Sequence, residues 1–155
     1  MLNRIRRLAF ALSTLAAASL LAASPAALAQ ADAALAAAGK EAGASVTKSG
    51  LVYRSLKDGT GASPSATDKV KVHYRGSFPD GREFDSSYKR NEPTEFPLNG
   101  VIPCWTEGVQ LMKVGGKAKL TCPAAIAYGA RGAGGVIPPN ATLQFEIELL
   151  AVNGK

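Results

Sequence analysis

The chain has 155 residues, enough for one domain and too few for two. The formal net charge is +6, and three of the arginines lie in the first 29 residues, which carry no acid. Removing those 29 of the 155 residues leaves 126 with a net charge of +3, too mild a balance for a nucleic-acid-binding protein. One histidine and two separated cysteines give no metal-ligand set, so we expect no metal and no other cofactor.

The N-terminal 29 residues have the layout of a cleaved signal peptide. Three arginines precede an uncharged apolar run, and Ala27-Leu28-Ala29 offers an A-x-A cleavage site before Gln30. A transmembrane helix is the alternative, which the alanine-rich run and its break at Ser24-Pro25 disfavour. We therefore expect residues 1–29 to be removed, with Gram-negative-type export to a periplasmic or secreted location and no stable membrane anchor.

Residues 30–48 are rich in alanine and glycine. They have room for a turn or two of helix, but Gly39 and Gly43 favour a linker. The folded domain is therefore predicted to occupy residues 49–155.

From Leu51 onward, apolar residues mostly alternate with period two, which is typical of half-buried strands. In 69–77 the pattern places Tyr74 inward and His73 outward, and in 117–122 it places Thr121 outward. The strong turn Pro79-Asp80-Gly81 separates two of the strands. The predicted strands are 51–56, 69–77, 83–86, 94–98, 117–122 and 142–151.

One amphipathic helix is predicted at Val101–Met112. Pro103 suits a first helical turn, and Gly115-Gly116 supplies a stop. Trp105, Val109 and Met112 share one apolar face at i, i+4 and i+7. Together with the strands, this helix predicts an α+β domain in which a curved antiparallel sheet packs on one short helix.

The usual catalytic constellations are not indicated. His73, the only histidine, is predicted to face solvent, whereas a Ser–His–Asp triad needs a histidine held between both partners. Ser86-Ser87-Tyr88-Lys89 fits S-x-x-K without the accompanying lactamase motifs. The glycines of the long loop 123–141 lead into Pro138-Pro139, not into the helix N-terminus that a phosphate cradle needs.

The compartment in which the protein is expected to reside determines how its two cysteines are interpreted. Cys104 opens the helix and Cys122 lies on the inward face of the strand that follows. Two buried thiols are the alternative, but an oxidising compartment favours a disulfide, provided that the two Cα atoms come within bridging range.

A set of aromatic and aliphatic residues at inward positions remains. Such a set is more often core than pocket. Asp85, beside Phe84, and the hydroxyl of Tyr128, which needs a partner, favour a pocket. The set comprises Tyr74, Phe84, Phe96, Val101, Ile102, Trp105, Tyr128, Ile137 and Phe145.

Five motifs stand in order within this region, between about Val46 and Val152. Together they resemble the FKBP-type peptidyl-prolyl isomerases, the macrolide-binding immunophilins. The motifs are Val72-His73-Tyr74-Arg75-Gly76, Asp80-Gly81-Arg82-Glu83-Phe84-Asp85-Ser86-Ser87, Val101-Ile102-Pro103-Cys104-Trp105, Ala127-Tyr128-Gly129 and Val136-Ile137-Pro138-Pro139-Asn140-Ala141-Thr142-Leu143.

The resemblance implies a half-barrel of five or six antiparallel strands wrapped around the helix, with a proline pocket floored by Trp105. The backbone N–H of Ile102 and the hydroxyl of Tyr128 would bind carbonyl groups, and Asp85 would orient the polar edge. The implied catalytic residues are Tyr74, Asp85, Trp105, Tyr128 and Phe145, and the implied substrate-binding residues are Phe84, Phe96, Val101, Ile102 and Ile137.

The implied partners are proline-containing unfolded or exported polypeptides and macrolide inhibitors of the FK506/rapamycin class, bound by a monomer. Cys104, Thr94 and Ala133 depart from the residues of many members, which bears on affinity and sequence preference. A chaperone or binding module with weak or incidental isomerase activity is the alternative function, and a structural domain with a filled pocket is a third.

Overall fold

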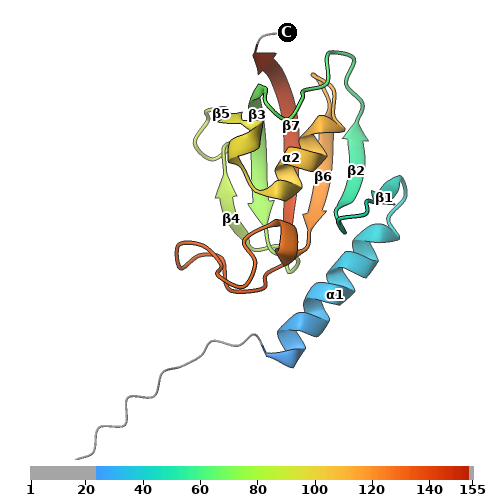
Figure 1. Cartoon of the computed structure of the whole chain (residues 1–155), viewed down its shortest axis with the longest axis vertical. Coiled ribbons are helices and arrows are strands. Elements are labelled where there is room, and N and C mark those ends of the chain that lie inside the picture. The colour runs from blue at the N-terminus through green and yellow to red at the C-terminus, as the bar shows by residue number, and fades with distance from the viewer. Residues whose placement is uncertain (1–23, 154–155) are drawn as a thin grey trace, which may run out of the picture.

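The computed structural model of the chain describes residues 24–153. They form a seven-stranded antiparallel sheet that curves around helix α2, and helix α1 extends from the side of the sheet that carries β1 (Figure 1). The helices are α1 (Pro25–Gly39) and α2 (Pro103–Gln110), with single 3₁₀ turns at Leu98–Gly100 and Ala124–Ile126. The strands are β1 (Ala44–Val46), β2 (Val52–Lys57), β3 (Lys69–Ser77), β4 (Glu83–Ser86), β5 (Thr94–Pro97), β6 (Lys117–Cys122) and β7 (Leu143–Asn153).

The sheet is built on the pair β3 and β7, which run antiparallel from Lys69 opposite Asn153 to Ser77 opposite Gln144. Its strand order is β1-β2-β6-β7-β3-β4, and β5 also pairs with β3. β5 pairs with the first half of β3 and β4 with the second half. Between them, the Ser87 amide donates to the Tyr74 carbonyl, so the chain follows β3 as far as Tyr74, whose side chain lines the pocket described below.

The predicted α+β architecture is confirmed, and most strands fall within a residue or two of the expected bounds. There are seven strands where five or six were implied, since the short strand β1 pairs with the start of β2. Thr121, predicted to face outward into solvent, is buried. The reason is that α1 packs against β1, β2 and β6 and covers the outer face of the sheet there.

Helix α2 fills the concave side of the sheet. Trp105, Val109 and Met112 are all buried, as the apolar stripe predicts. The helix begins at Pro103 but ends at Gln110, ahead of the predicted glycine stop. The amides of Leu111 and Met112 donate to carbonyls three residues back, which tightens the last turn and ends the helix early.

Helix α1 is longer than the turn or two that the sequence predicts, and it runs through the predicted cleavage site after Ala29. Alanine has the highest helix propensity, and the Ser24 side chain accepts a hydrogen bond from the amide of Ala27 at the N-terminus. Glu41, just after the helix, bonds to Arg54 at 2.8 Å and to Lys119 at 3.0 Å. These ion pairs tie the end of α1 to β2 and β6.

No helix within residues 24–153 is long and apolar enough to cross a membrane. The arginines and the apolar run of the predicted signal peptide lie outside the described residues.

Candidate functional site

A cavity of about 460 Å³ opens at the end of the sheet where β3 parts from β5 and where α2 begins. Most of its lining is aromatic or aliphatic, and strands, helix and loops all contribute. The lining residues are Tyr74, Phe84, Asp85, Phe96, Gly100, Val101, Ile102, Trp105, Tyr128 and Phe145.

Nine of the ten predicted site residues line this cavity. The exception is Ile137, which is buried in the core. It is paired with Ala133 by two backbone hydrogen bonds of 2.9 and 3.0 Å, and this tight turn of the 123–141 loop sets its direction. Sequence reasoning missed Gly100, which lines the cavity just before α2.

Trp105 forms the floor, with aromatic rings around it on three sides. Its ring centroid lies 5.2 Å from that of Tyr74, 5.5 Å from that of Phe96 and 5.4 Å from that of Phe145. The interplanar angles of 80–89° are edge-to-face, the arrangement that aromatic pairs favour. The indole is therefore held in place from β3, β5 and β7 together.

Gly76 of β3 has no side chain, so the two rings that wall the cavity beside it can pack against each other. A Cβ at this position would lie 2.6 Å from Phe84 and 3.0 Å from Phe145, both closer than side-chain carbons normally come. The two rings pack edge to face with centroids 5.7 Å apart. The glycine in the first motif is thus a packing requirement, which strand periodicity does not reveal.

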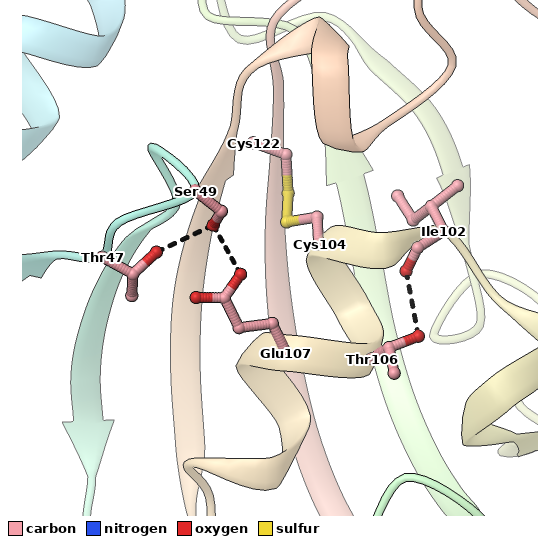
Figure 2. The surroundings of a disulfide bond; sticks show 7 residues. All are labelled: Thr47, Ser49, Ile102, Cys104, Thr106, Glu107 and Cys122. Carbon is pink, nitrogen blue, oxygen red and sulfur yellow. Dashed lines mark hydrogen bonds between the residues drawn. A yellow bond between two sulfur atoms is a disulfide. The ribbon is translucent and has the colours of Figure 1, made fainter.

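A disulfide anchors the start of α2 to the sheet. Cys104 and Cys122 are bonded, with Cα atoms 5.9 Å apart, within the usual bridging range (Figure 2). On the same side of the helix, Glu107 accepts a hydrogen bond from Ser49 in the β1–β2 turn. Because Trp105 follows Cys104 directly, both contacts hold the cavity floor in register with β6 and β2.

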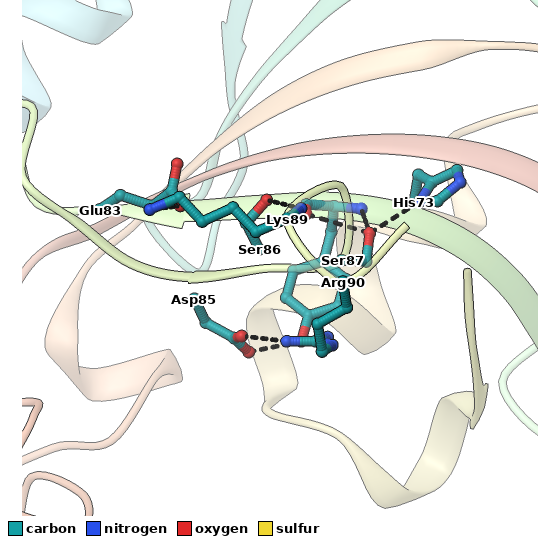
Figure 3. A network of polar contacts seen from close by, with 8 residues as sticks. His73, Glu83, Asp85, Ser86, Ser87, Lys89 and Arg90 are labelled. Atoms are coloured by element: carbon teal, nitrogen blue, oxygen red, sulfur yellow. Dashed lines mark hydrogen bonds and ion pairs between the residues drawn. The ribbon is translucent and has the colours of Figure 1, made fainter. Parts of the chain in front are cut away.

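The polar edge is a triad of Tyr74, Asp85 and Arg90. The Tyr74 hydroxyl donates to one oxygen of Asp85, and Arg90 Nη1 donates to the other at 2.6 Å. Arg90 Nη2 also donates to the Tyr74 hydroxyl at 3.1 Å, and Figure 3 shows the guanidinium beside Asp85. Sequence reasoning missed Arg90 because the loop between β4 and β5 that carries it has no periodicity to read.

These contacts set the charge of the carboxylate. Burial is the largest single influence on the pKa of Asp85 and raises it, but the hydrogen bonds from Tyr74 and Arg90 together prevail and lower it. Burial, aided by Asp85, raises the pKa of the Tyr74 phenol. Asp85 is therefore an anion and Tyr74 a neutral donor at neutral pH.

His73 lies outside the cavity, as predicted. It stacks on Tyr88 with ring centroids 4.7 Å apart, and its Nδ1 is 2.9 Å from the Ser87 hydroxyl. The same hydroxyl accepts a hydrogen bond from the Tyr74 amide at 2.8 Å, so it satisfies a backbone donor at the edge of β3. The Lys89 amine forms an ion pair with Glu83 at 2.8 Å (Figure 3). Lys89 therefore does not act with Ser86 as an S-x-x-K motif would require.

Two further polar groups lie at the cavity. Tyr128 stands at the rim with 38% of its surface exposed. Trp105 Nε1 is buried without a partner in residues 24–153. Nor does that part of the chain bring three His, Cys, Asp or Glu side chains close enough to hold a metal ion.

A half-barrel around one helix, with a tryptophan-floored aromatic cavity at the helix start, defines the FKBP class of fold. The family model described as FKBP-type peptidyl-prolyl cis-trans isomerase matches residues 61–150, more than half of the chain. The chain therefore belongs to the FKBP-type peptidyl-prolyl cis-trans isomerase family.

Two curated relatives share this domain. The FKBP-type peptidyl-prolyl cis-trans isomerase FkpA of Aeromonas hydrophila is 59% identical over 113 residues, which are 73% of this chain and 42% of the relative. The FKBP-type 22 kDa peptidyl-prolyl cis-trans isomerase of Escherichia coli K12 is 55% identical over 113 residues, 73% of this chain and 55% of the relative. The chain thus spans about half the length of these relatives.

Solved structures of two peptidyl-prolyl isomerases are similar to this one. The crystal structure of FkpA from Escherichia coli matches with a TM-score of 0.79 and 46% identity, covering 82% of this chain and 59% of that one. A peptidyl-prolyl cis-trans isomerase from Pseudomonas syringae pv. tomato matches with a TM-score of 0.76 and 41% identity, covering 82% of this chain and 93% of that one.

Proposed function

We propose that this chain is a peptidyl-prolyl cis-trans isomerase that assists the folding of exported proteins. The observation that carries the proposal is the aromatic cavity floored by Trp105, in a chain that belongs to the isomerase family. Its volume of about 460 Å³ is within the range of small-ligand sites, so a prolyl ring and its neighbours fit.

The chemistry needs no nucleophile. Rotation about a peptide bond has a barrier of about 20 kcal/mol from amide resonance, and no bond is broken or formed. An apolar cavity disfavours the polar, planar imide relative to the less polar twisted state. Donors aimed at the twisted carbonyl then stabilise that state further.

Nine of the ten residues that line the cavity take a role in this scheme. Trp105 and Phe145 hold the prolyl ring, with Phe84, Phe96 and Val101 as walls. The Ile102 amide and the Tyr128 hydroxyl donate to carbonyls of the peptide. Asp85, fixed by Tyr74 and Arg90, sets the potential at the polar edge.

The setting is periplasmic or secreted. The N-terminal segment has the layout of a signal peptide, and a buried disulfide suits an oxidising compartment. We also propose that the domain is a monomer, because the exposed large apolar side chains of residues 24–153 are spread over several elements and loops. These side chains are Leu28, Val46, Leu56, Tyr88, Leu111, Tyr128 and Val136.

An isomerisation assay tests the function. The purified protein should accelerate the cis-to-trans conversion of a tetrapeptide that contains proline. An FK506-class macrolide should inhibit it by occupying the cavity over Trp105. Tryptophan fluorescence should change on binding, since the chain has one tryptophan and it lies at the floor. Absence of any rate increase at micromolar protein would contradict the proposal.

A further inference from the structure

The disulfide lies between two segments of the proposed active site. Cys104 is the second residue of α2, two residues after Ile102 and directly before Trp105 (Figure 2). Cys122 is the last residue of β6, and the loop that follows it carries Tyr128 to the cavity. One covalent bond therefore joins the start of the helix to the start of the loop.

Each of these segments carries a hydrogen-bond donor without an acceptor. Neither the Ile102 amide nor the Tyr128 hydroxyl makes a hydrogen bond to another residue of 24–153. Both residues line the cavity. The two donors assigned above to carbonyl groups of the peptide are thus free, and their separation decides whether one peptide can bond to both.

On the loop side, short-range hydrogen bonds tie Tyr128 to Cys122. The carbonyl of Ala124 accepts from the amides of Ala127 and Gly129 at 3.0 and 2.8 Å. These bonds close the 3₁₀ turn that begins two residues after Cys122, and their donors are the two neighbours of Tyr128. The position of Cys122 is therefore passed on to Tyr128 through a constrained backbone.

On the helix side, the link from the disulfide to the donor is equally short. The Ile102 carbonyl accepts from the amides of Trp105 and Thr106 at 2.9 and 3.2 Å, so Ile102 moves with the first turn of α2. Both Cys104 and Cys122 are fully buried. The bridge therefore fixes the first turn of the helix against the end of β6.

We propose that the Cys104–Cys122 bridge positions the catalytic donors, by setting the separation of the Ile102 amide and the Tyr128 hydroxyl. The proposal rests on the isomerase function proposed above and adds a condition to it, since a chain with two free thiols is then a weak isomerase. In bridge formation the two thiols lose two protons and two electrons, and the disulfide that accepts them becomes a dithiol.

A double-mutant cycle tests the proposal. kcat/KM for a proline tetrapeptide is measured for the wild type, for Tyr128→Phe, for the bridge-free variant Cys104→Ala/Cys122→Ala and for their combination. With the bridge, Tyr128→Phe should lower kcat/KM by at least about 5-fold. Without it, kcat/KM should already be at least about 5-fold lower, and Tyr128→Phe should lower it by no more than about 2-fold further, because the hydroxyl is no longer held in place.

Controls separate position from stability. Each variant is assayed at a temperature at which circular dichroism shows it to be folded. Val152→Ala removes buried methyl groups near the far end of β7, so it should destabilise the fold and leave the Tyr128→Phe factor unchanged. Wild-type protein refolded with a dithiol reductant should match the bridge-free variant, and reoxidation should restore its kcat/KM.

Pro123→Gly takes the place of the bridge-free variant in the cycle if that variant does not fold. It keeps both cysteines and frees the backbone between Cys122 and the 3₁₀ turn, so it should reduce the Tyr128→Phe factor at least about 2-fold. Pro79→Gly, in the turn between β3 and β4, is the matched control and should leave the factor unchanged.

The other outcomes contradict the proposal in different ways. Equal Tyr128→Phe factors in the two backgrounds of the cycle would overturn the positioning role and leave the isomerase function standing. A factor below about 2-fold in the wild type would also overturn it, because the hydroxyl would then contribute nothing for the bridge to position. No acceleration by the wild type would overturn the proposed function and the positioning role together.

Discussion

At the scale of single residues, the site depends on side chains that are positioned by others. Asp85 is useful as a fixed anion only because Tyr74 and Arg90 bond to both of its oxygens. The closed wall of Phe84 and Phe145 exists only because Gly76 has no side chain. Two of these three supporting residues belong to the predicted motifs, and only Arg90 lies outside them.

Arg90→Ala is expected to lower stability at neutral pH by less than about 1 kcal/mol, since the pair with Asp85 is nearly half exposed. The pKa of Asp85 is lowered in the folded state, so its contribution is present above the unfolded-state pKa of about 4 and is lost as pH falls. Urea unfolding should therefore show the difference at pH 7 and lose it near pH 2. A difference that persists in acid would show that Arg90 acts through packing. Arg90→Lys is the matched control, because it keeps the positive charge and loses the guanidinium group, whose two nitrogens bond to Asp85 and Tyr74.

Gly76→Ala is expected to cost about 1–3 kcal/mol of unfolding free energy, because the new Cβ would overlap both Phe84 and Phe145. The same displacement should lower kcat/KM. Ser77→Ala, at the next position of β3, is the control and should change both little. Wild-type stability in Gly76→Ala would contradict the packing assigned to β3.

At the scale of elements, most of the secondary structure could be predicted from period-two alternation and from the apolar stripe of α2. They predicted the strands and the buried face of Trp105, Val109 and Met112. They could not predict that Thr121 is covered, because α1 supplies the cover and its alanines show no contrast between faces. Nor could they predict that Ile137 is buried in the core outside the cavity, since a glycine-rich loop has no period.

The Cys104–Cys122 disulfide is expected to stabilise the folded domain by about 3 kcal/mol in the chain-entropy model, given a sequence separation of 18. Replacing both cysteines with alanine should lower the unfolding free energy by at least that amount, because both positions are fully buried. Thiol titration of denatured, unreduced periplasmic material should find no free thiol. Two titratable thiols would refute the bridge in the exported protein.

At the scale of the whole molecule, α1 spans the predicted cleavage site after Ala29 and the first half of the predicted linker 30–48. Cleavage after Ala29 would remove the first residues of the helix and leave the rest tied by Glu41 to Arg54 and Lys119. The sequence predicted the family, the fold and most of the residues that line the cavity, because five motifs are collinear. It did not predict the length of α1, because alanine suits both a linker and a helix.

Export is expected to yield a mature chain that starts at Gln30. Intact-mass measurement of protein recovered from the periplasm should show the loss of residues 1–29. A membrane-retained chain that still carries Met1 would contradict the signal peptide. Ala29→Asp, which disturbs the small-residue site, should slow processing without changing the folded domain.

The central claim is that catalysis comes from the aromatic cavity and its polar edge and not from a nucleophile, and kcat/KM of point variants tests it most directly. Asp85→Ala, Tyr128→Phe and Phe145→Ala should each lower kcat/KM by about 5- to 150-fold, equivalent to ~1–3 kcal/mol of transition-state stabilisation, without abolishing it. His73→Ala should leave kcat/KM unchanged, since His73 lies outside the cavity. Loss of activity in His73→Ala, with full activity in Asp85→Ala and Phe145→Ala, would contradict the account.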